Sequence, residues 1–141
     1  FDMIRTGVEN LDFLLDGGLK NSTITDIFGS SGTGKTQLAL QIILNSMSEN
    51  IKVLYQDTTG NFRPERLVEM AKFMHLEMNF LDKITVERIT NVSEQQKSLD
   101  SFWCTSFVSY WGVLLQLFHF SNSLIKAFSI FRGGGKLCCC C

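Results

Sequence analysis

The sequence lacks an excess of charge of either sign, any internal repeat and any coiled-coil heptad pattern. Its net charge is −1 and its pI is about 6.1, which excludes a broadly basic nucleic-acid coat protein. Hydrophobic residues make up 45% of the chain and charged residues 19%, so wholesale disorder and a fibrous structure are also excluded. The 141 residues are enough for one domain and not for two.

The five cysteines are not spaced for a zinc site. Cys104 stands alone and the other four are consecutive, at 138–141, with no C-x-x-C pair and no pair of nearby histidines. His75 and His119 are isolated in the sequence, and we expect them to be surface or packing residues. We expect the cysteine run to be an unstructured end.

Acidic residues are absent after Asp100. Residues 1–100 contain all 14 acidic residues and ten of the 13 Lys and Arg, whereas residues 101–141 contain both tryptophans and all five cysteines. We therefore divide the chain into a first segment, residues 1–100, and a tail, residues 101–141. The first segment has the composition of an ordinary domain and shows no signal peptide, so we expect it to be cytoplasmic.

The tail contains 24 consecutive uncharged residues, 102–125. A stretch of that length is sufficient to cross a bilayer, but Gln116, His119 and Asn122 argue against a membrane span. A buried continuation of the domain would normally contain charged turns between its elements. We expect a non-native tail, such as a shifted reading frame or a chimeric gene would produce, with the membrane segment and the buried continuation as alternatives.

The first segment predicts alternating strands and helices. Short, apolar, β-branched runs predict strands at 24–28, 53–55 and 84–89. Apolar periodicity predicts one helix at about 35–48 and another from Pro64 onward, with a short helix within 6–19 that ends before two glycines. This alternation is typical of an α/β fold in which crossover helices join the strands of a parallel sheet.

The turn between the first of these strands and the following helix matches the phosphate-binding pattern G-x-x-x-x-G-K-[ST] in full. It consists of Gly29, Ser30, Ser31, Gly32, Thr33, Gly34, Lys35 and Thr36. The glycines let backbone N–H groups surround a phosphate, and the start of the helix adds positive potential. Lys35 is placed to reach the β and γ phosphates and the Thr36 hydroxyl to bind Mg²⁺. The pattern predicts nucleotide binding.

The phosphate loop does not determine the base. Residues 57–60 (DTTG) follow an apolar strand and also fit the D-x-x-G pattern of GTPases. However, only 22 positions separate Lys35 from Asp57, which is too few for the switch segment of a small GTPase. The guanine motif N-K-x-D is absent from the sequence as well. A GTPase is therefore the weaker alternative.

Four stretches of the first segment fit one known pattern. They are residues 4–18 (IRTG, then LD, L and GG), 29–37 (GSSGTGKTQ), 53–66 (VLYQDTTGNFRPER) and 88–95 (RITNVSEQ). Together they resemble the ATPase core of RecA-superfamily recombinases of the archaeal RadA and RadB type, in which the last two stretches read DTEGTFRPER and R-x-x-N-x-x-x-Q. The resemblance covers about residues 4–97. It implies a RecA-like P-loop NTPase of the α/β class, a three-layer structure with parallel strands, which would be incomplete in this chain.

The resemblance also implies roles for individual residues. Residues 29–36 and the adjacent Gln37 would hold ATP and Mg²⁺, with Lys35 stabilising the phosphates. Arg66 would lie near the adenine, where its guanidinium can stack, although a solvated charge on a helix face is an equal alternative. Thr59 occupies the position of the glutamate that activates the attacking water, and a hydroxyl has no comparable basicity. We therefore expect weak ATP hydrolysis or none.

The family's function implies a role in DNA repair and recombination. DNA would be a partner of the full-length family, and self-association or a recombinase partner is expected. A strand ending in Asp for the metal and two DNA-binding loops should follow residue 100, but no acidic residue is present there. The alternatives are an active DNA-dependent ATPase with a substitute base, a KaiC-like or other P-loop NTPase, and a truncated product without function.

Overall fold

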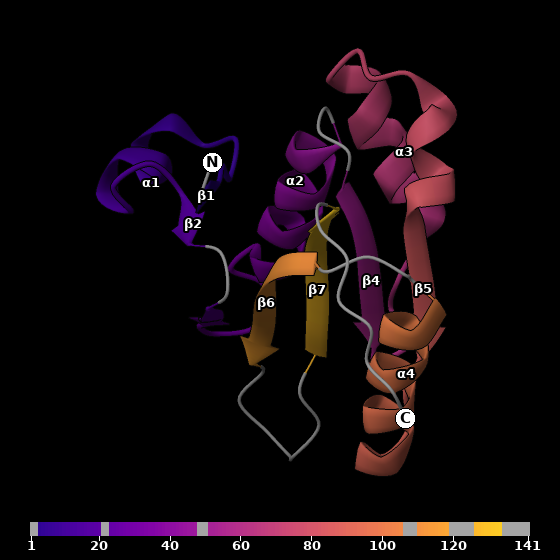
Figure 1. Cartoon of the computed structure of the whole chain (residues 1–141). Coiled ribbons are helices and arrows are strands. Elements are labelled where there is room, and N and C mark those ends of the chain that lie inside the picture. Colours follow the sequence, from indigo (N-terminus) through magenta and orange to yellow (C-terminus); the bar gives the residue numbers. More distant parts are fainter. Residues whose placement is uncertain (1–2, 21–22, 48–50, 106–109, 119–125, 134–141) are drawn as a thin grey trace.

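A computed structural model describes residues 3–20, 23–47, 51–105, 110–118 and 126–133 (Figure 1). The predictions for His119 and for the cysteines at 138–141 lie outside these residues. Within the described residues, no helix is long and apolar enough to cross a membrane. The helices are α1 (Glu9–Leu14), α2 (Lys35–Ser46), α3 (Pro64–Phe73), the 3-10 helix η1 (Met78–Lys83) and α4 (Val92–Thr105). The strands are β1 (Met3–Ile4), β2 (Leu19–Lys20), β3 (Ile24–Phe28), β4 (Ile51–Asp57), β5 (Ile84–Arg88), β6 (Tyr110–Phe118) and β7 (Lys126–Gly133).

The main sheet has five strands in the order β3-β6-β7-β4-β5 (Figure 1). Strand β3 is parallel to β6, and β4 is parallel to β5, whereas β7 is antiparallel to both of its neighbours. Strands β3, β4 and β5 therefore run in the same direction. Their carboxyl ends lie at the same edge of the sheet, which we call the carboxyl edge.

Strand β4 shows that helices cover both faces of this sheet. Val53 and Tyr55 belong to the apolar core that includes side chains of α2 and α3. Because side chains alternate along a strand, Gln56 faces the other way. Its Nε2 donates hydrogen bonds to the carbonyl of Gln95 at 3.1 Å and to Oγ of Ser98 at 2.9 Å, both in α4. The structure therefore has three layers, with α2 and α3 on one face and α4 on the other.

Helix α2 is buried because it is apolar on most sides. Five of its hydrophobic side chains are at most 5% exposed: Ala39, Leu40, Ile42, Ile43 and Leu44. This burial fixes the helix against the sheet, and it thereby fixes the loop that precedes its first residue. The predicted strand at 24–28 and the predicted helix starts at Lys35 and Pro64 are confirmed. Strand β4 is longer than the predicted 53–55.

A smaller unit precedes the main sheet. Strands β1 and β2 pair antiparallel, and α1 lies in the segment between them. The backbone N–H and the hydroxyl of Thr6 both donate to Oδ1 of Asp12, at 2.8 Å and 2.7 Å. These bonds tie the chain before α1 to the middle of that helix. The short helix predicted within 6–19 is therefore present, and it ends before the two glycines as expected.

The tail enters the main sheet. Helix α4 continues across residue 100, and β6 and β7 lie between β3 and β4 (Figure 1). No strand was predicted in this part of the chain, where β6 lies within the uncharged run at 102–125 and β7 begins directly after it. The proposed division of the chain at residue 100 stays a prediction.

Two phenylalanines allow the apolar core to be tested. Phe80 in η1 is 2% exposed and packs in the core, whereas Phe73 at the end of α3 is 88% exposed. We expect Phe80→Ala to lower the free energy of unfolding by about 3–5 kcal/mol, because it leaves a cavity. Phe73→Ala should change it by less than about 0.5 kcal/mol. Urea denaturation measures both, and equal losses would contradict this description of the core.

Candidate nucleotide-binding site

The phosphate loop lies at the carboxyl edge, between β3 and α2. Gly32 and Gly34 have φ angles of +78° and +87°, which residues with a Cβ rarely adopt. No atom lies within 4 Å of where a Cβ would stand at either position, so the backbone angle and not crowding requires glycine there. The loop is exposed, and α2 begins directly after Gly34. Its N–H groups and the positive end of α2 are therefore accessible to an anion.

The side chain of Lys35 folds back along the loop. Its Nζ donates to the carbonyls of Gly29 at 2.9 Å and Ser30 at 2.6 Å, and lies 3.4 Å from Oγ1 of Thr33. The Thr33 hydroxyl in turn donates to the carbonyl of Ser30 at 2.9 Å. The ammonium group therefore lies against the loop that would enclose a phosphate. Thr36, in the first turn of α2, is half-buried.

Gln37 and Arg66 meet across two helices. Nε and Nη2 of Arg66 in α3 donate to Oε1 of Gln37 in α2, at 3.3 Å and 3.1 Å. The amide of Gln37 also donates to the sulfur of Met70 at 3.2 Å. Both predicted site residues are exposed, and the structure brings them together beside the phosphate loop.

The loop that follows β4, residues 58–62, is held by the carboxylate of Asp57. Its Oδ1 accepts hydrogen bonds from the N–H groups of Thr59 (3.1 Å) and Gly60 (3.0 Å) and from the Thr59 hydroxyl (3.2 Å). Its Oδ2 accepts one from the N–H of Phe62 at 2.9 Å. Burial alone would raise the pKa of this carboxyl, but the bonds from Phe62, Thr59 and Gly60 outweigh it and lower the pKa. We call residues 58–62 the β4 loop.

Aromatic packing holds the far end of the β4 loop. The rings of Tyr55 and Phe62 lie 4.8 Å apart between centroids, at an angle of 47°. Burial, and secondly the negative charge of Asp57, raise the pKa of Tyr55 to about 12. Tyr55 therefore remains a neutral packing residue beneath the loop over the physiological pH range.

Thr59 is exposed on the β4 loop, and its hydroxyl donates a hydrogen bond to Asp57. A hydroxyl engaged in this way presents no basic group. Arg88 belongs to the R-x-x-N-x-x-x-Q stretch, and the sequence alone predicts no role for it. Its Nη1 donates to the backbone carbonyl of Asp57 at 3.3 Å. Its position at the end of β5, where the carboxyl edge lies, was the signal available in the sequence.

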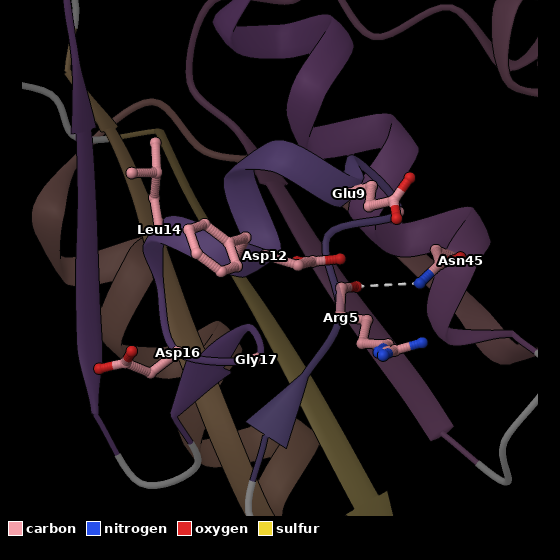
Figure 2. Close-up of a pocket in the computed structure, with 9 residues that line it drawn as sticks. Arg5, Glu9, Asp12, Leu14, Asp16, Gly17 and Asn45 are labelled. Atoms are coloured by element: carbon pink, nitrogen blue, oxygen red, sulfur yellow. Dashed lines mark hydrogen bonds between the residues drawn. The ribbon is translucent and has the colours of Figure 1, made fainter.

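A separate hollow of about 790 Å³ lies beside α1 (Figure 2). Figure 2 shows Asn45 of α2 reaching the backbone of Arg5, and the amide donates to the Arg5 carbonyl at 3.0 Å. Acidic side chains and exposed apolar side chains of the α1 region line the rest of the hollow. It contains no residue of the phosphate loop and neither Thr59 nor Arg66. The hollow is therefore distinct from the candidate nucleotide site.

The carboxylate of Asp57 can be tested by stability at two pH values. Because its pKa is lowered in the folded state, it contributes stability above its ordinary pKa of 3.8, and this contribution is lost as pH falls through the lower folded value. Asp57→Asn should lower the free energy of unfolding by about 1–3 kcal/mol at pH 7, since it weakens the hydrogen bonds of the loop. The loss relative to the unmodified chain should shrink below pH 4. Chemical denaturation measures it, and an equal loss at both pH values would contradict the role assigned to this carboxylate.

Curated relatives with similar sequences are DNA repair and recombination proteins. The chain is 40% identical over 100 residues to the DNA repair and recombination protein RadB of Thermococcus sibiricus. This alignment covers 70% of this chain and 42% of the relative. It is also 40% identical, over an alignment of 142 residues, to the meiotic recombination protein DMC1 homolog of Arabidopsis thaliana. That alignment covers 95% of this chain and 40% of the relative. The chain therefore spans less than half the length of these relatives.

The fold agrees with the sequence comparison. A crystal structure of the RadB recombinase aligns with a TM-score of 0.64 and 38% identity, and the alignment covers 73% of this chain and 46% of that one. The Rad51 family model matches residues 2–115, which extends past residue 97, the end of the resemblance inferred from the sequence. The chain therefore belongs to the Rad51 family and has the RecA-like α/β fold of a RadA/RadB-type core.

Proposed function

We propose that this chain is an ATP- and Mg²⁺-binding module of DNA repair and recombination that hydrolyses ATP weakly or not at all. The observation that carries the proposal is the phosphate loop, in which Lys35 Nζ lies 2.9 Å and 2.6 Å from two loop carbonyls at the start of a buried helix. The names of the relatives support the cellular role. The chain spans only part of those relatives, so the activity of a whole protein is part of the proposal.

The residues of the loop fit the phosphates of a nucleoside triphosphate. Two glycines with positive φ angles and the N-terminus of α2 form an exposed anion site. Residues 29–36 would hold the phosphates, and Thr36 would contribute its hydroxyl to Mg²⁺. The metal would neutralise part of the charge of the phosphates when bound. Arg66 would contact the adenine, with Gln37 fixing the guanidinium from the neighbouring helix.

Hydrolysis requires a group that removes a proton from water, and the β4 loop offers none. The Thr59 hydroxyl donates a hydrogen bond to the Asp57 carboxylate. Asp57 is the nearest carboxylate along the chain, but its two oxygens accept four hydrogen bonds and its pKa is lowered, which makes it a weak base. A base supplied by a neighbouring subunit would be needed for an active enzyme. We therefore favour ATP binding without efficient turnover.

DNA and a second recombinase subunit are the partners that this function implies. A module that binds ATP without hydrolysing it would contribute to an assembly through its nucleotide-bound form. All of the proposed nucleotide contacts lie within residues 1–100. We accordingly propose that the first segment carries the nucleotide site and that the tail contributes no residue to it.

Lys35→Ala tests nucleotide binding. Loss of a charge-assisted contact to the phosphates should raise the Kd for ATP with Mg²⁺ about 10- to 100-fold. Isothermal titration calorimetry measures the change. Lys97→Ala is the matched control, because Lys97 is an exposed lysine on α4. If both variants bound ATP as tightly as the unmodified chain, the loop would not be the nucleotide site.

Thr59→Glu tests the reason given for weak hydrolysis. A carboxylate at this position should raise the rate of ATP hydrolysis about 10²- to 10⁴-fold, the usual contribution of a positioned base. Thr59→Gln is the control, because glutamine has nearly the same size without the basic group. Phosphate release measures the rates. Rapid hydrolysis by the unmodified chain that Lys35→Ala abolishes would instead establish the active-ATPase alternative.

A further inference from the structure

Arg88 and the next residue, Ile89, join the end of the edge strand β5 to Asp57, the last residue of β4. Its Nη1 donates to the backbone carbonyl of Asp57 at 3.3 Å. The backbone N–H of Ile89 donates to the same carbonyl at 3.0 Å. The end of β5 is thereby fastened to the last residue of β4, directly before the loop begins.

The guanidinium of Arg88 also packs against Gly60. A Cβ at Gly60 would lie 2.9 Å from Nη1, 3.1 Å from Cζ and 3.3 Å from Nη2, so all of these atoms pass close to the glycine backbone. The N–H of Gly60 donates to the Asp57 carboxylate at 3.0 Å. Gly60 is therefore held between a carboxylate and a guanidinium, and its φ of +72° favours glycine for a second reason.

Arg88 is exposed and uses one of its five N–H groups in the bond to Asp57. Within the described part of the chain it forms no ion pair, so its position is set by these contacts to the loop and not by a carboxylate partner. Thr58 and Thr59 lie between Asp57 and Gly60, the two positions whose backbone Arg88 contacts. Movement of the guanidinium would therefore displace position 59.

We propose that Arg88 is a positioning residue of the nucleotide site, whose guanidinium holds the β4 loop in the conformation that faces the terminal phosphate of ATP. The inference rests on the proposed function. Position 59 is where the family resemblance places the residue nearest the attacking water, so the loop faces the γ phosphate. ADP lacks that group. Loss of the Arg88 contact therefore weakens binding of ATP and leaves binding of ADP unchanged.

The test compares the affinities of ATP and ADP in the full 141-residue chain with Mg²⁺. Arg88→Met should raise the Kd for ATP about tenfold and change the Kd for ADP by less than about twofold. Arg88→Lys should recover part of the affinity for ATP, because an ammonium can still donate to the Asp57 carbonyl. Lys97→Met removes a positive charge elsewhere on the surface and should leave both values unchanged.

Gly60→Ala changes the same contact from the side of the loop. The added methyl would meet the guanidinium, and the φ of +72° would also be strained, so this variant should reduce the preference for ATP over ADP at least as much as Arg88→Met does. Circular dichroism melting confirms that each variant is folded before its affinity is compared.

The outcomes separate the two proposals. If the unmodified chain binds no ATP, the proposed function fails and the positioning role fails with it. If it binds ATP but Arg88→Met weakens ATP and ADP equally, or neither, the role of Arg88 is refuted while nucleotide binding stands.

Discussion

The common direction of β3, β4 and β5 is the constraint on which the candidate site depends. Strand β3 is parallel to β6, and β7 is antiparallel to both β6 and β4. Strands β3 and β4 therefore run in the same direction. The phosphate loop, the β4 loop and Arg88 consequently lie at one edge, which is where ligands bind in open α/β sheets. The burial of α2 then fixes the start of that helix, and with it the phosphate loop.

Asp57 connects the sheet to the chemistry of the site. Its carboxylate holds the β4 loop with four hydrogen bonds, and its backbone carbonyl accepts from Arg88 and Ile89. A carboxylate that satisfies so many donors shapes the loop, but its lowered pKa makes it a poor base. Position 59 is therefore held in place by its neighbours, and the proposal of weak hydrolysis rests on the hydroxyl that it carries there.

The sequence predicted those parts of the fold that depend on local pattern. The phosphate loop between β3 and α2 and the start of α3 at Pro64 follow from glycine spacing, apolar periodicity and a first-turn proline. Strands β6 and β7 were not predicted; β6 lies within the uncharged run at 102–125, and such a run is compatible with a buried strand and with a membrane span. The contacts of Arg88 depend on tertiary pairing, since Asp57 lies 31 positions away along the chain.

The central claim is that the phosphate loop binds ATP and that the chain leaves it intact. The most direct measurement incubates the 141-residue chain with Mg²⁺ and ATP, separates the protein from free nucleotide and identifies the nucleotide it retains by chromatography. The account predicts that the retained nucleotide is ATP, in a ratio of about one per chain, consistent with a single phosphate loop. Retained ADP, or no retained nucleotide, would contradict it.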